Sequence, residues 1–374
     1  MTTLSVSILG SFAESLINFR GPLLEALVHR GHRVVACAPA APAPVVDALT
    51  TMGVTYRDVP FRRAGMRLDE DLRALRALIG LFRELRPDIV LTYTIKPVIY
   101  GLLAARLVGV PRRFAIITGL GYTFVGADLK ARLVGAAARQ LYRLSLGGAD
   151  RVFFQNPDDR ALFERLGLLR GPDQAVLING SGIDLDQFQP VPLPSDGASF
   201  LLIARLLKDK GIREYIQAAR QVRARHPGAS FHLVGWLDQG NPAGIAEDEL
   251  RAWIAEGVIH YHGRLEDVRP AIAATSVYVL PSYREGTPRT VLEAMAMGRP
   301  IVTTDVPGCR ETVRDGVNGY LVPAQDASAL AGALERFLRE PNLIEAMGRE
   351  SRRIAVEKYD VRKVNATILE AMGL

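Results

Sequence analysis

The chain has 374 residues, of which 48% are hydrophobic and 23% are charged, with 34 glycines and 22 prolines. This composition indicates a soluble globular protein of two domains, and it excludes a disordered chain, a collagen-like repeat and a coiled coil. The formal net charge is +6, and the whole excess lies in residues 1–190, which carry 23 Lys and Arg against 17 Asp and Glu. A one-sided basic surface favours an anionic partner, either nucleic acid or an anionic membrane surface.

The sequence indicates a reducing compartment and no membrane span. Its two cysteines, Cys37 and Cys309, lie in different halves, and neither has a neighbour at metal-ligand spacing. We therefore expect a cytosolic protein without disulfides or a zinc site. The N-terminus lacks the basic region of a signal peptide, and the longest apolar stretch, residues 98–110, is too short to cross a bilayer. Any membrane association is expected to be peripheral.

The first half alternates apolar strands with amphipathic helices. It begins with a strand over residues 4–9, a turn at Gly10 and a helix that is capped by Gly31. Continuous apolar strands alternating with helices predict a parallel sheet covered on both faces. Further strands are expected at residues 33–38, 89–93, 114–118, 152–155 and 175–178, and helices at residues 72–85, 98–107 and 129–146.

The second half repeats this rhythm after a segment rich in proline and glycine, residues 189–197. Ligands of doubly wound α/β sheets bind outside the carboxyl ends of the strands, so the expected site is a cleft between two such domains. Strands are expected at residues 200–204, 231–234, 258–261, 277–280 and 301–303. We predict a first domain over 1–180, a linker over 181–198, a second domain over 199–352, and a C-terminal helical segment, 353–374, that packs back toward the first domain.

The strongest motif, residues 281–298, follows one of the predicted strands. We expect Thr287 to cap a helix and Pro288 to occupy its first position. Glu285 then lies in the loop at the carboxyl end of the strand, and Glu293 lies about a turn and a half inside the helix. The free amides at the start of this helix could hold a phosphate.

A second motif places Arg205 and Lys210 directly after the first strand of the second domain. The planar guanidinium and the ammonium point charge both suit a diphosphate. Each cation alone would be interpreted as a solvated loop charge. Their occurrence together, with the two glutamates after a later strand, favours a binding site.

These motifs together resemble the family 4 glycosyltransferases, which are retaining enzymes that use nucleotide sugars and have the GT-B fold of two Rossmann-like domains. The resemblance covers essentially the whole chain and implies a hexosyltransferase. It implies that Glu285, Arg205 and Lys210 are catalytic, with Glu285 holding donor-sugar hydroxyls rather than acting as a nucleophile. The further residues that it implies for the donor site are Gly10, Gly263, Arg264, Gly286, Thr287 and Glu293.

Three segments resemble a bacterial subgroup that builds lipid-linked oligosaccharides and surface polysaccharides. They are residues 94–97 with 100–101, residues 118–124, and residues 281–286. This subgroup includes N-acetylgalactosaminyltransferases acting on N,N′-diacetylbacillosaminyl-diphospho-undecaprenol. The resemblance implies a UDP-sugar donor, with UDP-N-acetylgalactosamine as the best guess, and a polyprenyl-diphosphate-linked sugar as acceptor. Many relatives carry a histidine where residues 91–96 have none. The implied acceptor residues are Thr94, Lys96, Gly119 and Gly121.

No metal or other cofactor is expected. Asp184 and Asp186 match the D-x-D pattern of metal-dependent glycosyltransferases, but they lie in the linker motif and not at a nucleotide-binding strand end. His260 and His262 share one strand face but lack an evident third ligand.

Two alternatives stay open at this point: a nucleotide-sugar epimerase on the same fold, and a donor-binding subunit with weak or no catalysis. Nucleic acid is not an expected partner, because the basic residues are not interleaved with base-stacking aromatics. We expect the protein to lie in the cytoplasm, at the inner face of the cell membrane. The predicted membrane-facing patch comprises Arg57, Arg62, Arg63 and Arg67 beside Phe61 and Met66.

Overall fold

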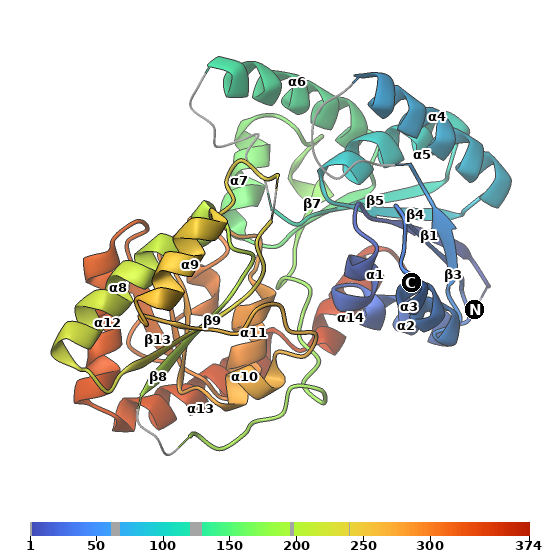
Figure 1. Ribbon diagram of the computed structural model, residues 1–374. Helices are drawn as coiled ribbons and strands as arrows, with labels where there is room; N and C mark the ends of the chain where they lie inside the picture. Colours follow the sequence, from blue (N-terminus) through green and yellow to red (C-terminus); the bar gives the residue numbers. More distant parts are fainter. Residues whose placement is uncertain (1, 61–67, 120–128, 195–197, 239) are drawn as a thin grey trace. The chain divides into compact units, whose positions relative to one another are not determined.

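The computed structural model describes the chain except for residues 1, 61–67, 120–128, 195–197 and 239. It divides into two compact units, Met1–Ser181 with Arg362–Leu374, and Gly182–Val361. Each unit is a parallel sheet flanked by helices (Figure 1). The segment that the sequence predicts as a linker belongs to the second unit from Gly182 onward, where Ile183 forms a bridge with Asp360.

The sheet of the first unit has seven strands in the order β3-β2-β1-β4-β5-β6-β7. The strand β3 is absent from the sequence prediction, because its residues have no apolar run and are mostly exposed. The other strands are close to their predicted ranges. The strands are β1 (Ser5–Leu9), β2 (Arg33–Ala38), β3 (Thr55–Asp58), β4 (Ile89–Tyr93), β5 (Arg112–Ile117), β6 (Arg151–Phe154) and β7 (Ala175–Leu177).

Helices cover both faces of this sheet (Figure 1). Side chains of the C-terminal helix α14 (Val361–Ala371), including Ile368 and Leu369, join the same core cluster as Leu16 and Leu23. The predicted segment 353–374 is therefore not one element, because its first residues belong to α13 of the second unit. One face carries α1 (Glu14–Asn18), α2 (Gly21–His29), α3 (Ala43–Thr51) and α14, and the other carries α4 (Leu68–Leu85), α5 (Leu102–Val108), α6 (Leu129–Leu146) and α7 (Pro157–Arg165).

The amphipathic helix α4 packs on its sheet as its pattern predicts, with Ala74, Leu78 and Phe82 buried. No helix among the described residues is long and apolar enough to cross a membrane.

The sheet of the second unit has six strands in the order β10-β9-β8-β11-β12-β13. The edge strand β13 is not predicted by the sequence. The strands are β8 (Ser199–Ile203), β9 (Ser230–Val234), β10 (His260–Tyr261), β11 (Val277–Leu280), β12 (Ile301–Thr304) and β13 (Gly319–Val322). The helices are α8 (Ile212–Arg225), α9 (Glu247–Ala255), α10 (Arg269–Ala273), α11 (Arg289–Ala296), α12 (Ala327–Arg339) and α13 (Asn342–Lys358).

Both sheets reverse their strand order at one point, between β1 and β4 in the first unit and between β8 and β11 in the second. The loops leave such a point in opposite directions, which opens a crevice at the carboxyl ends of the two strands. Gly10 and Thr94 follow the strands at the first switch point, and Arg205, Lys210 and Glu285 follow those at the second. The sequence-predicted residues therefore flank the place where such folds bind ligands.

Three histidines meet at the β9–β10 edge of the second sheet. His232 pairs in register with His260, its Nδ1 lies 3.0 Å from Nε2 of His262, and its ring stacks on both neighbours. His232 is the third imidazole that the sequence analysis did not find, because it lies on the neighbouring strand. Among the described residues no group of side chains is arranged to hold a metal ion.

The histidine cluster predicts a loss of stability in acid. Burial, and then the charges of His260 and His262, lower the pKa of His232 to about 4. An unfolded histidine binds its proton near pH 6.5, so stability is present above that pH and is lost as the pH falls from about 6.5 to 4. Because the cluster is partly exposed, we expect a loss on the order of 1 kcal/mol.

Urea unfolding of wild type and His232→Asn at pH 7 and pH 5 tests this effect. The variant should show a smaller difference between the two pH values, and His29→Asn, at an exposed position on α2, should behave like wild type. An unchanged pH difference in His232→Asn would contradict the effect.

Candidate active site

The loops that follow β8, β11 and β12 are tied together by backbone groups at the carboxyl edge of the second sheet. The carbonyl of Asp209 accepts hydrogen bonds from the Tyr283 amide at 2.8 Å and from the Ser282 hydroxyl at 3.0 Å. The Glu285 amide donates to the carbonyl of Pro307 at 3.0 Å. Three segments far apart in sequence thus form one platform.

Two glycines allow these loops to approach so closely. A β-carbon on Gly211 would lie 2.0 Å from the carbonyl oxygen of Pro281, and one on Gly308 would lie 2.2 Å from that of Glu285. Both glycines also have positive φ values, +70° and +86°. Any other residue would push the β11 loop away from its neighbours.

The platform brings Lys210 and Glu285 into contact. The Lys210 ammonium forms an ion pair with Oε1 of Glu285, and each side chain is 16% exposed. Oγ of Ser282 also lies 2.8 Å from this carboxylate oxygen, so its single hydroxyl hydrogen is shared between Glu285 and the Asp209 carbonyl. Ser282, which is fully buried, is a site residue that sequence reasoning missed. Glu285 is therefore fixed from two sides at the mouth of the crevice.

Arg205 lies at the carboxyl end of β8 and pairs with a different carboxylate. Its Nη1 lies 2.9 Å from Oδ2 of Asp238, which follows β9. The sequence does not predict this pairing, because a carboxylate in a loop carries no local signal of its partner. Both predicted diphosphate-binding cations thus have an acidic partner from a neighbouring loop.

The second glutamate, Glu293, occupies a different environment from the first. It lies on α11, is 7% exposed and accepts a hydrogen bond from Nε of Arg289 at 2.9 Å. Burial raises the pKa of its carboxyl group, and Arg289 opposes the shift. Since the two glutamates have different partners, they do not resemble the acid/base pair of a hydrolase acting on one atom.

The start of α11 differs by one residue from the prediction. The capping residue is Pro288, with the extended backbone φ of −73° and ψ of 110°, and the helix begins at Arg289. Thr287 therefore lies in the loop before the helix rather than at its cap. Gly286 is buried and Thr287 half-buried, between Glu285 and the first turn of α11.

The loop after β10 carries Gly263 and Arg264. The Gly263 carbonyl accepts a hydrogen bond from the Gly235 amide at 2.8 Å, and Arg264 lies 5.1 Å from the ring centre of Trp236. β10 is two strands from β8, a distance of about 10 Å at the usual strand spacing. Gly263 and Arg264 therefore lie at the same carboxyl edge of the sheet as Arg205 and Lys210, two strands away.

The switch point of the first unit is strained. Thr94 has a φ of +68°, which is unusual for a β-branched residue, and a π-helical turn over Pro97–Gly101 follows it. The Thr94 hydroxyl donates to Oγ of Ser11 at 2.8 Å. A β-carbon on Gly10 would lie 2.3 Å from the hydroxyl oxygen of Tyr93, so Gly10 lets the Tyr93 side chain cross the end of β1.

The other predicted acceptor residues have separate outcomes. Lys96 forms an ion pair with Asp71 at 2.8 Å, with the two side chains 13% and 8% exposed. Gly119 is half-buried with a φ of +134°. Gly121 lies outside the described residues.

The first aspartate of the D-x-D pattern, Asp184, bonds to its own loop. Its carboxylate accepts hydrogen bonds from the amides of Asp186 and Gln187 at 2.9 and 3.1 Å, so it caps a turn.

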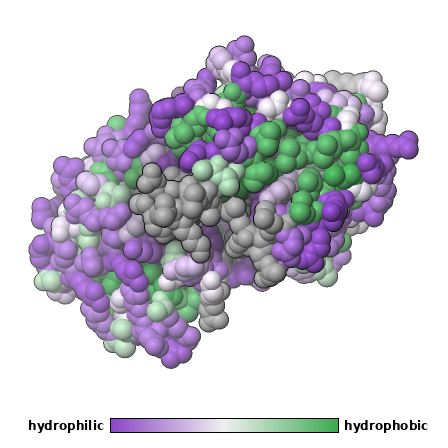
Figure 2. Space-filling model, turned by 90° about the horizontal axis from the view of Figure 1, so that it is seen from above, coloured by the Kyte–Doolittle hydropathy of each residue, from purple (hydrophilic) through white to green (hydrophobic). Residues whose placement is uncertain are grey.

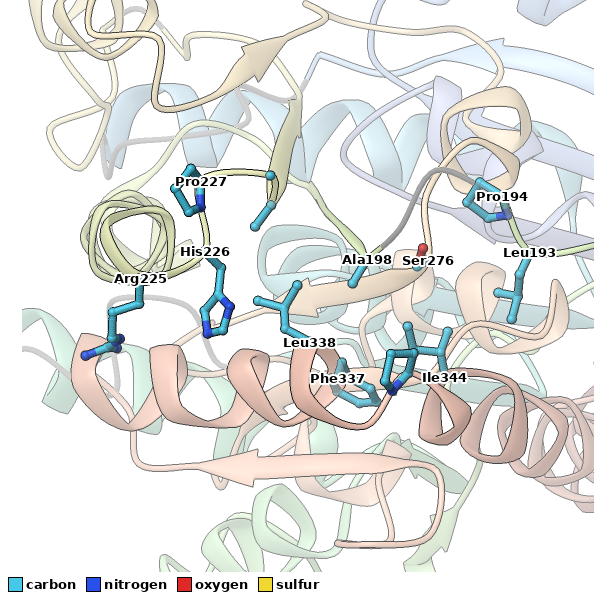
Figure 3. A pocket seen from close by; sticks show the side chains of 13 residues that line it. Leu193, Pro194, Ala198, Arg225, His226, Pro227, Ser276, Phe337, Leu338 and Ile344 are labelled. Atoms are coloured by element: carbon cyan, nitrogen blue, oxygen red, sulfur yellow. The ribbon is translucent and has the colours of Figure 1, made fainter.

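A cavity of about 620 Å³ lies elsewhere in the second unit (Figure 3). Its lining includes Ala198, Ala229 and Ser276, which directly precede β8, β9 and β11, and Phe337 of α12. It is therefore at the amino edge of the sheet, opposite the edge that carries Lys210 and Glu285. Ligands of such sheets bind at the carboxyl edge, so we place the candidate site there and not in this cavity.

Sequence comparisons identify the two halves. The family described as glycosyl transferases group 1 matches residues 197–340, and the glycosyl transferase 4-like domain matches residues 20–180. The N,N′-diacetylbacillosaminyl-diphospho-undecaprenol alpha-1,3-N-acetylgalactosaminyltransferase of Campylobacter jejuni is 28% identical over 90% of both chains. The UDP-Gal:alpha-D-GlcNAc-diphosphoundecaprenol alpha-1,3-galactosyltransferase of Escherichia coli is 24% identical over 82% of this chain and 80% of its own.

Solved structures share the fold. Anabaena Alr3699/HepE in complex with UDP and glucose superposes with a TM-score of 0.80 at 18% identity, with 99% of each chain covered. Sucrose-phosphate synthase from Thermosynechococcus elongatus gives a TM-score of 0.81 at 20% identity, with 98% of each chain covered. The chain therefore belongs to the group 1, family 4-like glycosyltransferases and has the GT-B fold of two Rossmann-like units.

Proposed function

We propose that this glycosyltransferase transfers a hexose or an N-acetylhexosamine, with retention, from a UDP-sugar to a polyprenyl-diphosphate-linked sugar. The observation that carries the donor assignment is the contact of Lys210 with Glu285 at the switch point of the second sheet, where Arg205 also follows the strand β8. The acceptor assignment draws on the C. jejuni and E. coli relatives, whose names specify diphospho-undecaprenol acceptors. Such transfer would serve the assembly of a surface polysaccharide, such as a capsule or lipopolysaccharide, or of a glycoprotein glycan.

In this proposal, the second unit stabilises the departing nucleoside diphosphate. Negative charge grows on the leaving phosphate as the glycosidic bond breaks, and groups that bind this charge lower the barrier. Arg205, Lys210 and the amino end of α11 fill this role in the proposal. The proposal assigns no part of this role to a metal ion. Glu285 binds hydroxyls of the donor sugar, and Glu293 accepts hydrogen bonds from the ribose hydroxyls. The leaving phosphate is the base that activates the acceptor.

The first unit takes the acceptor. Thr94, Gly119 and Gly121 are assigned to the acceptor sugar, and Lys96 is assigned to its diphosphate. The ion pair with Asp71 fixes the orientation of the nearly buried Lys96 side chain before an acceptor binds. Gly10 borders the same switch point and was assigned to the donor by resemblance.

Removal of the Lys210 charge tests the donor site. Lys210→Ala should lower kcat/KM for transfer by about 100-fold or more, because a preorganised charge at the leaving group is lost. Lys208→Ala, which removes an exposed lysine from the same turn, should stay within about twofold of wild type. The assay uses a panel of UDP-sugars with a synthetic polyprenyl-diphosphate monosaccharide and detects the product by mass spectrometry.

Three results would contradict this assignment. Full activity of Lys210→Ala would remove Lys210 from the site. A change in the donor sugar without acceptor would indicate an epimerase, which none of the comparisons supports. UDP binding without turnover for any acceptor would indicate a donor-binding subunit.

We further propose that the chain works at the cytoplasmic face of the membrane and docks through the outer side of α4, α5 and α6. Leu72, Leu107 and Leu144, one on each of these helices, are 53%, 67% and 58% exposed. Figure 2 shows a hydrophobic area on the side of the first unit that these helices cover. An exposed apolar area of this kind fits contact with the apolar part of a lipid bilayer.

Exposed arginines on the same helices provide charge for anionic lipid. Arg76 and Arg83 on α4 and Arg106 on α5 are exposed and form no ion pair with the described residues. Of the patch predicted from the sequence, Arg57 pairs with Glu84 at 2.7 Å. The other members of that patch, residues 61–63, 66 and 67, lie outside the described residues and stay part of the proposal.

Liposome sedimentation tests the membrane face. The double variant Arg76→Glu/Arg83→Glu should bind anionic vesicles at least tenfold more weakly than wild type, since each basic residue near such a surface contributes about 1 kcal/mol. Leu107→Glu should also weaken binding, whereas Ile254→Glu, at a 43% exposed position on α9, should not. Equal sedimentation of wild type with neutral and anionic vesicles would contradict the proposal.

A further inference from the structure

The loop after β9 is fastened to the loop after β8 by backbone hydrogen bonds. The Leu206 amide donates to the Trp236 carbonyl at 3.0 Å, and the Lys208 amide donates to the Ala243 carbonyl at 2.8 Å. The contact begins at Gly235, where a β-carbon would lie 1.9 Å from the carbonyl oxygen of Ala204. Arg205 directly follows Ala204, so the β9 loop is a fixed support beside Arg205.

A chain of hydrogen bonds connects this loop to Arg205 through the side chains of Asn241 and Asp238. Oδ1 of Asn241 accepts a hydrogen bond from the Ala243 amide at 3.0 Å, which fixes the Asn241 side chain. Its Nδ2 then donates to Oδ2 of Asp238 at 3.1 Å, and that same oxygen accepts the Arg205 Nη1 bond at 2.9 Å. Asp238 is thus held by its own loop and holds Arg205 in turn.

The contact with Asp238 leaves the more useful edge of Arg205 open. A guanidinium binds an oxyanion bidentately through Nε and Nη2, as Arg213 and Arg220 do here with Glu249 and Glu256. In Arg205, Asp238 takes only Nη1, and the Nε and Nη2 atoms bond to none of the described residues. The side chain is 32% exposed, so this edge is accessible to a ligand.

We propose that Asp238, supported by Asn241, is a positioning residue that orients Arg205 so that its Nε–Nη2 edge meets the donor diphosphate. This inference rests on the proposed function, which places the diphosphate beside Arg205. A carboxylate that merely occupied the phosphate position would compete with the donor, and its removal would tighten binding. A positioning carboxylate has the opposite effect, because its removal frees the arginine to move.

A double-mutant cycle read by UDP and uridine binding separates these possibilities. Asp238→Ala and Arg205→Ala should each weaken UDP binding about tenfold, the effect of one charge-assisted hydrogen-bonded pair. The double variant should also lose about tenfold and not a hundredfold, because Asp238 acts through Arg205. Uridine, which lacks phosphates, should bind all variants equally and so reports intact folding of the base site.

Two further variants sharpen the test. Asp238→Asn keeps an oxygen acceptor for Nη1 and should retain UDP affinity within about threefold. Glu256→Ala breaks a comparable arginine pair on the same unit, that of Arg220, and should leave UDP affinity unchanged.

The outcomes that overturn the inference are distinct. Tighter UDP binding by Asp238→Ala would make this residue a competitor, and multiplicative losses in the double variant would make it independent of Arg205. Weaker binding of uridine as well as UDP would indicate a general structural role. If Arg205→Ala itself leaves UDP affinity unchanged, the proposed diphosphate site fails together with the inference. If only Asp238→Ala is without effect, the inference alone fails.

Discussion

The candidate site depends on the close approach of two backbones at the switch point of the second sheet. Gly211 ends the β8 loop against the carbonyl group of Pro281, and only a residue without a β-carbon fits there. This contact brings Asp209 under the β11 loop, where its carbonyl accepts hydrogen bonds from Ser282 and Tyr283. As a result, Lys210 lies close enough to Glu285 to form an ion pair with it. The strands supply the frame, and the glycine contact determines which side chains meet.

Charge pairing stabilises the ionised side chains of the candidate site. Lys210 and Glu285 are each largely buried, and an isolated charge in such a place would be costly. The ion pair offsets part of that cost, and 16% of each side chain stays exposed. Arg205 is likewise paired with a carboxylate, that of Asp238. Because its guanidinium is a planar fork, Nη1 binds Asp238 while the Nε–Nη2 edge bonds to none of the described residues. Under the proposed function, the two cations would therefore present different geometries to a diphosphate.

The sequence predicts the fold and the members of the site better than it predicts their partners. Strand ends and their order place Lys210 and Glu285 at one edge although they are 75 residues apart. The strand β3 was missed because it has no apolar run, and His232 because it reaches the other histidines only through strand pairing. Asp238 and Ser282 carry no motif of their own, since a loop carboxylate or a serine gains its role from a tertiary contact. Thr287 was misplaced by one residue because both Thr and Pro suit the start of a helix.

The central claim is that a nucleoside diphosphate binds where the β8 and β11 loops meet. A crystal structure of the protein with UDP tests it most directly. We predict that phosphate oxygens lie within hydrogen-bond distance of Lys210 Nζ and of the Nε–Nη2 edge of Arg205, with the base beside Gly263. A diphosphate bound elsewhere, for example at the amino edge of the sheet, with the Lys210–Glu285 pair untouched, would contradict it.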